Sequence, residues 1–386
     1  MRHEVAVHAS IADIDADDWN AVAGDDYPFL RHDFLAAAEL TGCVSAETGW
    51  QPCHLALRDG EKLRAAMPLY QKSHSWGEFV FDWAWADAYR RAGLAYYPKL
   101  VSAVPFTPAP SRRLLLADPQ DDEAAGLLIK AARLLATESG ASSLHVLFPL
   151  AEEIRRLERF GLKARKDCQF HWHNAGYADF DEFLATFSAR KRKKARRDRR
   201  HVADAGIVFR RYTGGELDEA LWSDVYRLIS VTFMQRGSLP YFNLEFFRSI
   251  SASQPDNVLV IAGYRGDRML AAAVFFVSHD TLYGRYWGAD EQVNALHFET
   301  CYYQGIDYCI EHGLERFEPG TQGEHKVSRG FAPQSTWSAH WLRQPEFFSA
   351  ISDYLDEEAR HVDTYMDAVG ERTPFRRDGK LRDDDE

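Results

Sequence analysis

The sequence has few cysteines and no long apolar run. Its five cysteines are odd in number, scattered along the chain and without a CxxC pair, so the sequence predicts neither a disulfide framework nor a cysteine-based zinc site. No stretch approaches the roughly 18 apolar residues that a membrane span requires, and residues 1–10 lack the apolar core of a signal peptide. We therefore expect a cytosolic protein that does not span a membrane.

The chain also lacks the signatures of several enzyme classes. It contains no GxSxG nucleophile elbow, no Walker A motif and no strand-linked GxGxxG, which removes the usual sequence support for hydrolase, P-loop and Rossmann functions. No HxxxH motif or His/Cys cluster accompanies its histidines, so we expect no metal site. The net charge of −12 argues against a general affinity for nucleic acid or for an anionic membrane. These absences do not exclude an enzyme that transfers a chemical group.

What the chain does contain is an internal repeat. Residues 55–70 (LALRDGEKLRAAMPLY) align without a gap to residues 261–276 (IAGYRGDRMLAAAVFF), at an offset of 206 residues that pairs Gly60 with Gly266. In both segments a strand-like run breaks at a glycine followed by an acidic and a basic residue and then resumes, which predicts a β-hairpin. Because 386 residues are enough for two domains, we favour duplication over a chance likeness of two α/β segments.

A second similarity follows each hairpin. Residues 124–149 and residues 295–319 each have the pattern of a helix that ends at a glycine and is followed by a strand. The sequence thus predicts an α/β (α+β) fold of two tandem domains, each a mixed, largely antiparallel sheet flanked by helices. We expect the first domain over residues 1–175, the second over residues 176–344, and a C-terminal helix with a disordered charged tail over residues 345–386.

The strongest compositional feature is a basic stretch at residues 190–201, RKRKKARRDRRH, in which nine of twelve residues are Lys or Arg. We expect one helix from Phe183 through Ala203 that is cationic on nearly every face and therefore faces solvent or anions. Its candidate contacts to phosphate or RNA are Arg190, Arg192, Lys193, Lys194, Arg196, Arg197 and Arg200. The alternative is a charged helix that is merely solvated.

A strand end and the helix after it form a second dense region. Residues 283–288 end a strand, and we expect the following helix to be capped by Asn294. Such a junction favours anionic ligands because unpaired N–H groups and the helix dipole meet there. Glu299 lies in this largely apolar helix, where burial would raise its pKa and suit it to act as a base, although a structural hydrogen bond explains it equally well.

The loop at residues 317–331, FEPGTQGEHKVSRGF, is the third such region. Polar side chains alternate there with three glycines, and a polar loop at a strand end is typical of a functional site. Its polar residues are Glu318, Gln322, Glu324, His325, Lys326 and Arg329. His171 and His173 share one face of a further strand, which we expect to lie on the surface.

Together these segments resemble the FemAB-like family of peptidoglycan biosynthesis or recognition, a branch of the tandem-GNAT acyltransferases. The resemblance rests on PFLRHDFLAAAELTG at 28–42, VPFTP at 104–108, ADAGI at 203–207, RGSLPYF at 236–242, GRYWG at 284–288 and the loop at 317–331. It implies two GNAT-like domains and transfer of an acyl or aminoacyl group to an amine acceptor, with a peptidoglycan precursor as one candidate. No tightly bound cofactor is expected, and the donor would be acyl-CoA or aminoacyl-tRNA.

Two further likenesses leave the donor open. The basic stretch resembles the helix that opens the second domain of Fem aminoacyl ligases, which favours tRNA. Residues 285–290 resemble the first four positions of the GNAT loop Q/R-x-x-G-x-G/A, which holds a pyrophosphate on its backbone N–H groups. That segment ends in Asp290, whose charge would oppose a pyrophosphate.

For transfer to an amine, the chemistry requires a base, an oxyanion donor and residues that orient the substrates. The expected base is Glu299 or Glu324, with His325 as a second candidate, and backbone near Gly288 would face the oxyanion. The expected donor- and substrate-binding residues are Arg236, Tyr241, Arg285, Tyr286, Trp287, Gly288, Gln322, Lys326 and Arg329. Two rival functions stay open: a noncatalytic module that binds a cell-wall precursor or RNA, and an acetyl-CoA-dependent acetyltransferase of a small amine or a protein lysine.

Overall fold

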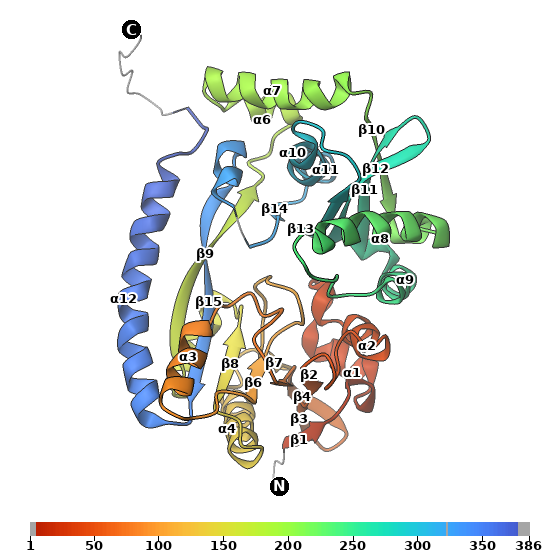
Figure 1. The fold of residues 1–386 in the computed structure, drawn as a ribbon. Helices are drawn as coiled ribbons and strands as arrows, with labels where there is room; N and C mark the ends of the chain where they lie inside the picture. The colour runs from red at the N-terminus through yellow and green to blue at the C-terminus, as the bar shows by residue number, and fades with distance from the viewer. Residues whose placement is uncertain (1–4, 322, 377–386) are drawn as a thin grey trace.

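The chain folds into a mixed α/β structure, shown in Figure 1. The computed structural model describes residues 5–321 and 323–376. Within that part, the strands form one sheet of four in the order β1-β3-β4-β7 and one sheet of eleven in the order β10-β11-β12-β13-β14-β9-β15-β8-β6-β5-β2. The described strand pairs are mostly antiparallel, with parallel pairing of β13 with β14 and of β6 with β8. The predicted mixed α/β fold is confirmed.

The smaller sheet contains β1 (Val5–His8), β3 (His54–Asp59), β4 (Lys62–Met67) and β7 (Leu115–Leu116). The larger sheet contains, in chain order, β2 (Trp50–Pro52), β5 (Tyr70–Lys72), β6 (Lys99–Ser102), β8 (Ser143–Leu147), β9 (Lys163–His173), β10 (Val208–Thr213), β11 (Val258–Arg265), β12 (Arg268–Val277), β13 (Thr281–Ala289), β14 (Arg316–Glu318) and β15 (Ala332–Leu342). The α-helices are α1 (Ala16–Ala23), α2 (His32–Leu40), α3 (Trp83–Arg91), α4 (Asp122–Glu138), α5 (Ala151–Arg159), α6 (Phe180–Ala185), α7 (Ala189–Asp204), α8 (Glu219–Met234), α9 (Leu244–Ser253), α10 (Leu296–Phe298), α11 (Gln304–His312) and α12 (Pro345–Gly370). A π-helical turn, η5 (Glu299–Tyr303), joins α10 to α11, and a 3₁₀ helix, η6 (Glu324–Arg329), precedes β15. Across residues 5–321 and 323–376, no helix is both long and apolar enough to cross a membrane.

The two repeated segments form matching β-hairpins, as the sequence predicts. β3 pairs with β4 and β11 pairs with β12, and the turn glycines Gly60 and Gly266 have φ values of 63° and 60°. The register of each hairpin shifts at the same place, between Leu57 and Arg58 in the first copy and between Gly263 and Tyr264 in the second. The likeness of the two copies thus extends to a local irregularity of the ladder.

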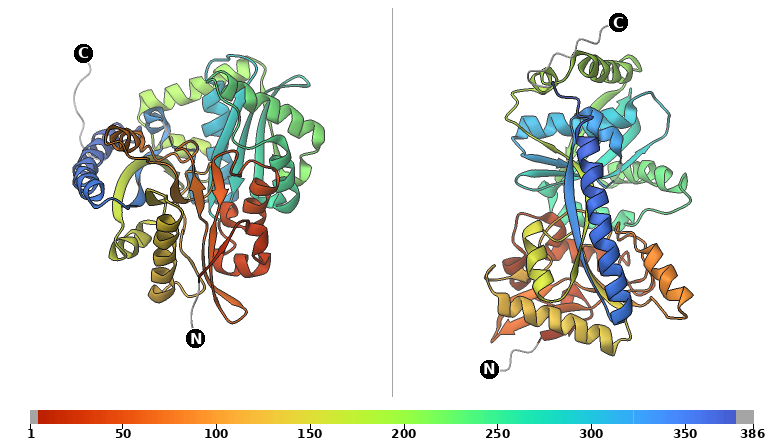
Figure 2. Two further views of the ribbon diagram at one scale, coloured as in Figure 1. Left: turned by 60° about the horizontal axis from the view of Figure 1, so that its bottom comes forward. Right: turned by 90° about the vertical axis from the view of Figure 1, so that its left-hand side faces the viewer.

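Two long strands tie the first half of the molecule (residues 5–173) to the second half (residues 180–331). β9 and β15 run antiparallel to each other, and β9 also pairs with β14 while β15 also pairs with β8. The long helix α12 lies along both strands (Figures 1 and 2). One sheet therefore runs through both halves, and the division at residues 175/176 stays a prediction.

An aromatic core also joins the halves. Phe29 and Phe34 of the first half pack against Phe246 and Phe276 of the second, with ring centroids 4.9 Å apart for Phe29 and Phe276 and 5.2 Å apart for Phe34 and Phe246. Rings of this size bury a large apolar area in edge-to-face contacts. The segment at residues 28–42 therefore anchors the interface between the halves.

Two predictions about helix ends are wrong. The expected single helix over the basic stretch is broken, because Phe187 is buried in the core between α6 and α7, 4.9 Å from the ring of Phe183. The helix after β13 begins at Leu296 rather than after an Asn294 cap, because Ala295 at its N-cap position adopts a left-handed φ of 68°. The C-terminal helix is confirmed as α12, and residues 377–386 of the expected tail lie outside the described residues.

Candidate active site

A β-bulge in β13 sends Arg285 into the interior. Val274 of β12 faces Tyr286 and Phe275 faces Gly284, so Arg285 is the extra residue of the bulge. Its guanidinium lies 5.4 Å from the centroid of the Tyr283 ring, and its Nη1 donates to the Gly284 carbonyl at 2.8 Å. Burial lowers the pKa of Arg285. Its Nε and Nη2 are buried and have no hydrogen-bond partner among the described residues, so they are free to donate to a ligand.

Glu318 is the last residue of β14, the strand next to β13. β14 pairs in parallel with the start of β13, where Tyr283 faces Glu318. The Glu318 side chain is buried, with 6% exposed, and burial raises its pKa to about 7 although Arg285 and Arg316 oppose that shift. Its Oε2 has no hydrogen-bond partner in the described part of the chain. A buried carboxylate with a pKa near neutrality and a free oxygen has the properties of a general base.

His171 of β9 faces this carboxylate, with its Nδ1 3.9 Å from Glu318 Oε1. Gln169 donates through Nε2 to the Pro108 carbonyl at 2.9 Å, so its Oε1 accepts from His171 Nε2 at 3.2 Å. Burial lowers the pKa of His171 to about 3, which keeps the ring neutral with Nδ1 as an acceptor. The prediction of a surface strand is wrong for His171, because β9 lies between β14 and β15; His173 is exposed as expected.

Lys326 completes the buried group from η6. It is 2% exposed, and its Nζ donates to the Gly320 carbonyl at 2.7 Å, which fixes the loop after Glu318. Burial, followed by repulsion from Arg285, lowers the pKa of Lys326 to about 7. An acid shifted upward and an amine shifted downward in one buried region are typical of an active site.

An aromatic and histidine wall lies next to η6. His325 is exposed, and its Nε2 lies 3.0 Å from the Tyr302 hydroxyl. The ring of His297 lies 5.1 Å from that of Trp287, and burial lowers the pKa of His297 to about 4. Arg329 is buried and its guanidinium lies 3.3 Å from the centroid of a neighbouring phenylalanine ring. The structure thus brings together His325, Trp287, Arg329 and Lys326 from the predicted set.

The two predicted bases lie elsewhere. Glu299 is buried at the contact of α7 with the π-helical turn, where its Oε1 accepts from Arg199 at 3.1 Å and burial raises its pKa. Glu324 is exposed and faces α12, where it accepts from the Tyr365 hydroxyl and from Arg372 at 3.2 Å each. Each carboxylate thus pairs with an arginine, which Glu299 shares with Asp307, while the buried Oε2 of Glu299 has no hydrogen-bond partner in the described part of the chain. The role of either carboxylate as a base stays a prediction.

The remaining predicted residues of the second half take different positions. Tyr241 stacks at 4.9 Å on a phenylalanine of the first half, Arg236 is exposed, and Tyr286 is buried among aromatic side chains. A Cβ on Gly288 would lie 1.9 Å from the Leu228 carbonyl oxygen, so close packing of α8 requires this glycine. Gln322 lies outside the described residues.

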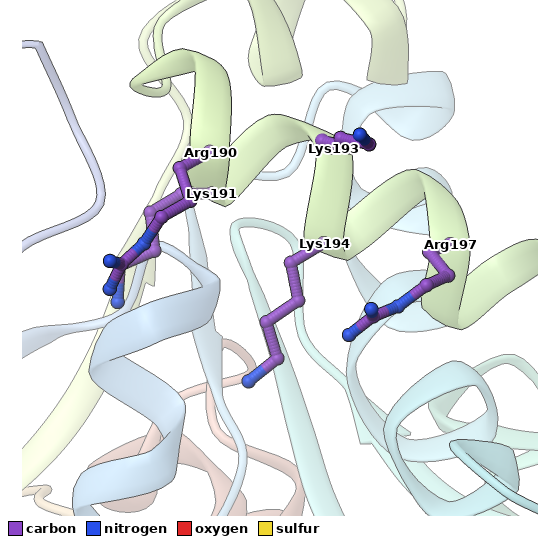
Figure 3. Close-up of a pocket in the computed structure, with 5 residues that line it drawn as sticks. All are labelled: Arg190, Lys191, Lys193, Lys194 and Arg197. Atoms are coloured by element: carbon purple, nitrogen blue, oxygen red, sulfur yellow. The ribbon is translucent and has the colours of Figure 1, made fainter.

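The basic helix α7 presents a cavity of about 400 Å³ (Figure 3). It is lined by Arg190, Lys191, Lys193, Lys194 and Arg197. In Figure 3, Lys194 and Arg197 extend to the same side of the helix as Arg190 and Lys191. The other predicted cations point elsewhere: Arg196 pairs with Asp181 at 2.9 Å, Arg192 hydrogen-bonds backbone carbonyls before the helix, and Arg200 is exposed.

The expectation that no side of α7 enters a core is wrong. Ala195, Asp198 and Val202 are buried on its inner face, because Asp198 accepts from the Tyr303 hydroxyl at 3.3 Å and lies 3.7 Å from Arg329. One aspartate with buried partners lets a cationic helix pack on the protein. Other faces of α7 carry the cations that line the cavity.

The predicted catalytic and binding residues do not include Glu318, His171 or Lys191, although Glu318 is among the polar residues of the candidate loop. Glu318 stands in the glycine-rich loop motif and at a strand end, which were the signals that could have identified it. His171 could be identified only through the pairing of β9 with the second half, which the sequence does not reveal.

Three comparisons place the chain among known proteins. A family model described as FemAB-like, peptidoglycan biosynthesis/recognition, matches residues 10–377. FemX is similar in structure, with a TM-score of 0.55 and 12% identity over 90% of this chain and 100% of that chain. The C-terminal domain of a putative lysylphosphatidylglycerol synthetase from Agrobacterium fabrum has a TM-score of 0.56 and 11% identity, covering 90% and 97%. L-PGS from Bacillus licheniformis has a TM-score of 0.51 and 10% identity, covering 86% and 98%.

No curated protein matches the sequence. Identities of 10 to 12% show the fold alone, and the likeness to FemX confirms the predicted Fem-type fold.

Proposed function

This chain belongs to the FemAB-like family, and we propose that it is an N-acyltransferase that moves an acyl or aminoacyl group from a CoA thioester or an aminoacyl-tRNA to a primary amine. A peptidoglycan precursor is the candidate acceptor, in keeping with the description of the family. The observation that carries the proposal is Glu318, a buried carboxyl with a pKa of about 7 and an oxygen without a partner among the described residues, close enough to Arg285 for that charge to lower its pKa.

The reaction needs no covalent enzyme intermediate. The amine nitrogen attacks the carbonyl carbon of the donor, and Glu318 takes the proton that the nitrogen loses as the C–N bond forms. The tetrahedral intermediate then collapses, the C–S or C–O bond breaks, and its electron pair leaves with the thiolate or the ribose oxygen, which is protonated. The enzyme holds the two substrates in position and supplies the base.

Arg285 is the proposed oxyanion donor. Its buried Nε and Nη2 are without partners in the described structure, so they can meet the negative charge that develops on the carbonyl oxygen. The backbone near Gly288 stays the alternative donor. The phosphates of the donor would lie on the cationic cavity of α7, since the described residues that line it are all Lys or Arg.

A comparison of two surrogate acceptors tests this proposal. An alkylamine is protonated at neutral pH and needs a base, whereas hydroxylamine is largely neutral and depends on one much less. We expect Glu318→Gln to lower transfer to N-acetylcadaverine by about 100-fold or more, and to lower transfer to hydroxylamine far less. Acetyl-CoA and a mixture of aminoacyl-tRNAs serve as donors in parallel assays with the full chain.

Donor binding is measured separately, at several salt concentrations. Saturable binding of one donor alone identifies it, and a steep salt dependence supports a polyphosphate or tRNA contact. If Glu318→Gln leaves both transfer rates unchanged while Lys194→Gln/Arg197→Gln abolishes ligand binding, the enzyme proposal is wrong and the chain is a binding module.

A further inference from the structure

Two buried polar side chains of β9, Gln169 and His171, lie on the same face of the strand. They are two residues apart, and side chains with that spacing share one face of a sheet. Each residue is 3% exposed. Gln169 contacts Pro108, in the segment at residues 104–108, and His171 faces Glu318. The pair therefore connects that segment of the first half to the proposed base.

The Pro108 carbonyl fixes the orientation of the Gln169 amide. A carbonyl oxygen can only accept a hydrogen bond, so Gln169 Nε2, 2.9 Å away, is the donor in this contact. The amide oxygen then faces the other way, where it lies 3.2 Å from His171 Nε2. Residues 104–108 are all buried, so this anchor lies away from solvent.

This orientation decides which ring nitrogen of His171 carries the proton. The Gln169 amide oxygen only accepts, so His171 Nε2 is the donor between them. Burial lowers the pKa of His171 to about 3, so the ring is neutral and holds a single N–H. Nδ1 therefore has a lone pair and no proton, and this is the nitrogen that faces Glu318.

The contact of His171 with Glu318 brings two acceptors face to face. Nδ1 and Oε1 are 3.9 Å apart, which is longer than the roughly 2.7–3.2 Å of a hydrogen bond. A charged carboxylate gains nothing from a lone pair, whereas a protonated carboxyl can donate to it. The arrangement thus favours the protonated form of Glu318, and an N–H donor at the same place would favour the charged form.

Other charged groups also act on Glu318. Arg285 of β13 and Arg316 of β14 lower its pKa, and Asp280, which precedes β13, raises it. Arg316 and Asp280 form an ion pair at 3.1 Å, so their effects oppose each other. Further ionisable groups nearby are Tyr27, Tyr283 and Lys326. None of these groups lies on β9, so that strand acts on Glu318 through the orientation of His171.

We propose that Gln169 and His171 are positioning residues for the base: anchored on the first half, they turn a lone pair instead of an N–H toward Glu318 and so keep this carboxyl able to take up a proton at neutral pH. The inference rests on the proposed function for the role of Glu318 as the base. It also gives the segment at residues 104–108 a task, since its backbone sets the direction of the whole chain of hydrogen bonds.

Histidine ¹⁵N NMR of the full chain tests the first step, because the two neutral tautomers have different ¹⁵N shifts. We expect the His171 signal, identified by its loss in His171→Asn, to show the Nε2–H tautomer at neutral pH. In Gln169→Met the amide is gone, so we expect Nδ1 to carry the proton and to donate to Glu318. Gln334→Met is the matched control, at an exposed glutamine opposite Gln169 on β15, and should leave the tautomer unchanged.

The titration of Glu318 tests the second step. Side-chain ¹³C NMR follows it without any substrate, and Glu318→Gln identifies the signal. Gln169→Met and His171→Asn each allow an N–H to face Glu318, so both should make it about 10-fold or more stronger as an acid. The rise of kcat/KM for an alkylamine should then move down by about one pH unit, which a loss of stability alone would not produce. His173→Asn, at an exposed histidine of β9, should change neither.

The outcomes separate this inference from the proposed function. If His171 carries its proton on Nδ1 in the unaltered chain, or if Gln169→Met leaves the tautomer or the titration of Glu318 unchanged, the positioning role is wrong. If Glu318 titrates at lower pH in both variants while Glu318→Gln keeps all transfer rates, the positioning role stands and the proposed base is wrong. Thermal unfolding checks the fold of each variant. Should Gln169→Met not fold, His171→Asn decides, because an unchanged titration in that variant also overturns the inference.

Discussion

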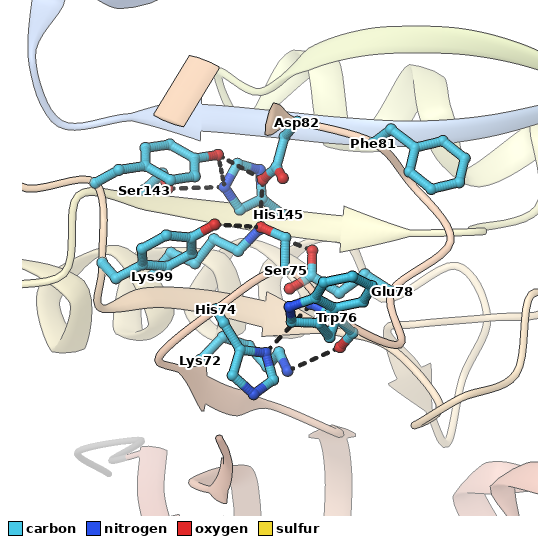
Figure 4. Close-up of polar contacts among 12 residues, drawn as sticks. Lys72, His74, Ser75, Trp76, Glu78, Phe81, Asp82, Lys99, Ser143 and His145 are labelled. Atoms are coloured by element: carbon cyan, nitrogen blue, oxygen red, sulfur yellow. Dashed lines mark hydrogen bonds and ion pairs between the residues drawn. The ribbon is translucent and has the colours of Figure 1, made fainter. Parts of the chain in front are cut away.

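Each half of the molecule contains a carboxylic acid whose pKa is raised to about 7 by burial, and the two acids differ in the residues that contact them. In the first half, Glu78 accepts from Lys99 at 2.7 Å, and Lys99 also donates to Ser75 at 2.8 Å and pairs with Asp82 (Figure 4). In the second half, no Lys or Arg of the described residues forms an ion pair with Glu318, whose Oε1 lies 3.9 Å from His171 Nδ1. One oxygen of each acid, Glu78 Oε1 and Glu318 Oε2, is without a hydrogen-bond partner in the described structure. Similar burial thus gives a fixed acid in one half and an available one in the other.

The surroundings of the two acids extend this contrast. Burial would raise the pKa of Asp82, but Lys99 and His145 lower it to about 2, so Asp82 stays charged. Tyr96 donates to Asp82 at 2.6 Å. Lys99 holds both carboxylates of the first half in place, although one oxygen of each has no partner among the described residues, whereas no cation of the described structure pairs with Glu318. We therefore propose that the second half carries out the transfer reaction and that the first half stabilises the fold.

The largest expected effect is on turnover. Glu318→Gln should lower the rate of transfer to an alkylamine by about 100-fold or more, because the base is lost. Glu78→Gln should leave that rate nearly unchanged at temperatures where the protein is folded, because Glu78 only holds Lys99. Steady-state kinetics with N-acetylcadaverine measure both. Equal losses in the two variants would remove the distinction between the halves.

The next effect is on stability. Lys99→Met should destabilise the fold by about 3–5 kcal/mol, because Glu78 and Asp82 would be left buried without their cation. Lys326→Met should cost far less, since Lys326 donates to a single carbonyl, that of Gly320 and its burial is itself unfavourable. Urea unfolding compares the two. A similar cost for both would show that the second half is as closed as the first.

A third effect is expected in how stability and kcat/KM depend on pH. Glu318 has a pKa of about 7 in the fold against an ordinary value of 4.5, so the folded state holds more protons between these values. Its contribution to stability therefore falls as pH rises from 4.5 to about 7, while kcat/KM for an alkylamine rises through the same range. Glu318→Gln should flatten both profiles. A rate profile that keeps its rise in Glu318→Gln would assign that rise to another group.

A smaller effect is expected at the surface of the second half. Lys194→Gln/Arg197→Gln should weaken donor binding about 10-fold at low salt and reduce its salt dependence, because two phosphate contacts are lost. Arg196→Gln is the matched control, since Arg196 pairs with Asp181 and does not line the cavity. Equal effects of the two variants would indicate general attraction rather than a site.

The smallest effect should be shared by both halves. Gly60→Ala and Gly266→Ala place a side chain at φ values of 63° and 60° with no atom within 4 Å of the new Cβ. Each substitution should therefore lower the free energy of unfolding by about 1–2 kcal/mol, because alanine disfavours the left-handed backbone conformation. Thermal unfolding measures both, and clearly unequal costs would show that the two hairpins have diverged in structure.

Local features of this fold could be predicted from the sequence, because they depend on neighbouring residues. The turns at Gly60 and Gly266 follow from glycine and the strand pattern around it. The bulge at Arg285 depends on how β12, β13 and β14 meet, and nothing in residues 283–288 reveals it. The pKa of Glu318 likewise depends on a strand from the other half.

The candidate site was predicted at the level of segments rather than atoms. The loop at residues 317–331 holds the buried Glu318 and Lys326, and its role as a site stays a prediction. Glu299 was chosen because burial was expected, and it is buried. Its pairing with Arg199, 100 residues away in the sequence, could not be inferred from helical periodicity.

The position of β15 has a consequence for how the chain is made. β8 and β9 leave the ribosome early, yet the strand that separates them is residues 332–342. Until those residues are translated, both early strands present an unpaired edge, and such edges recruit other chains. We therefore expect a nascent first half to require protection of these edges, and a chain released before Ala332 should be prone to aggregation.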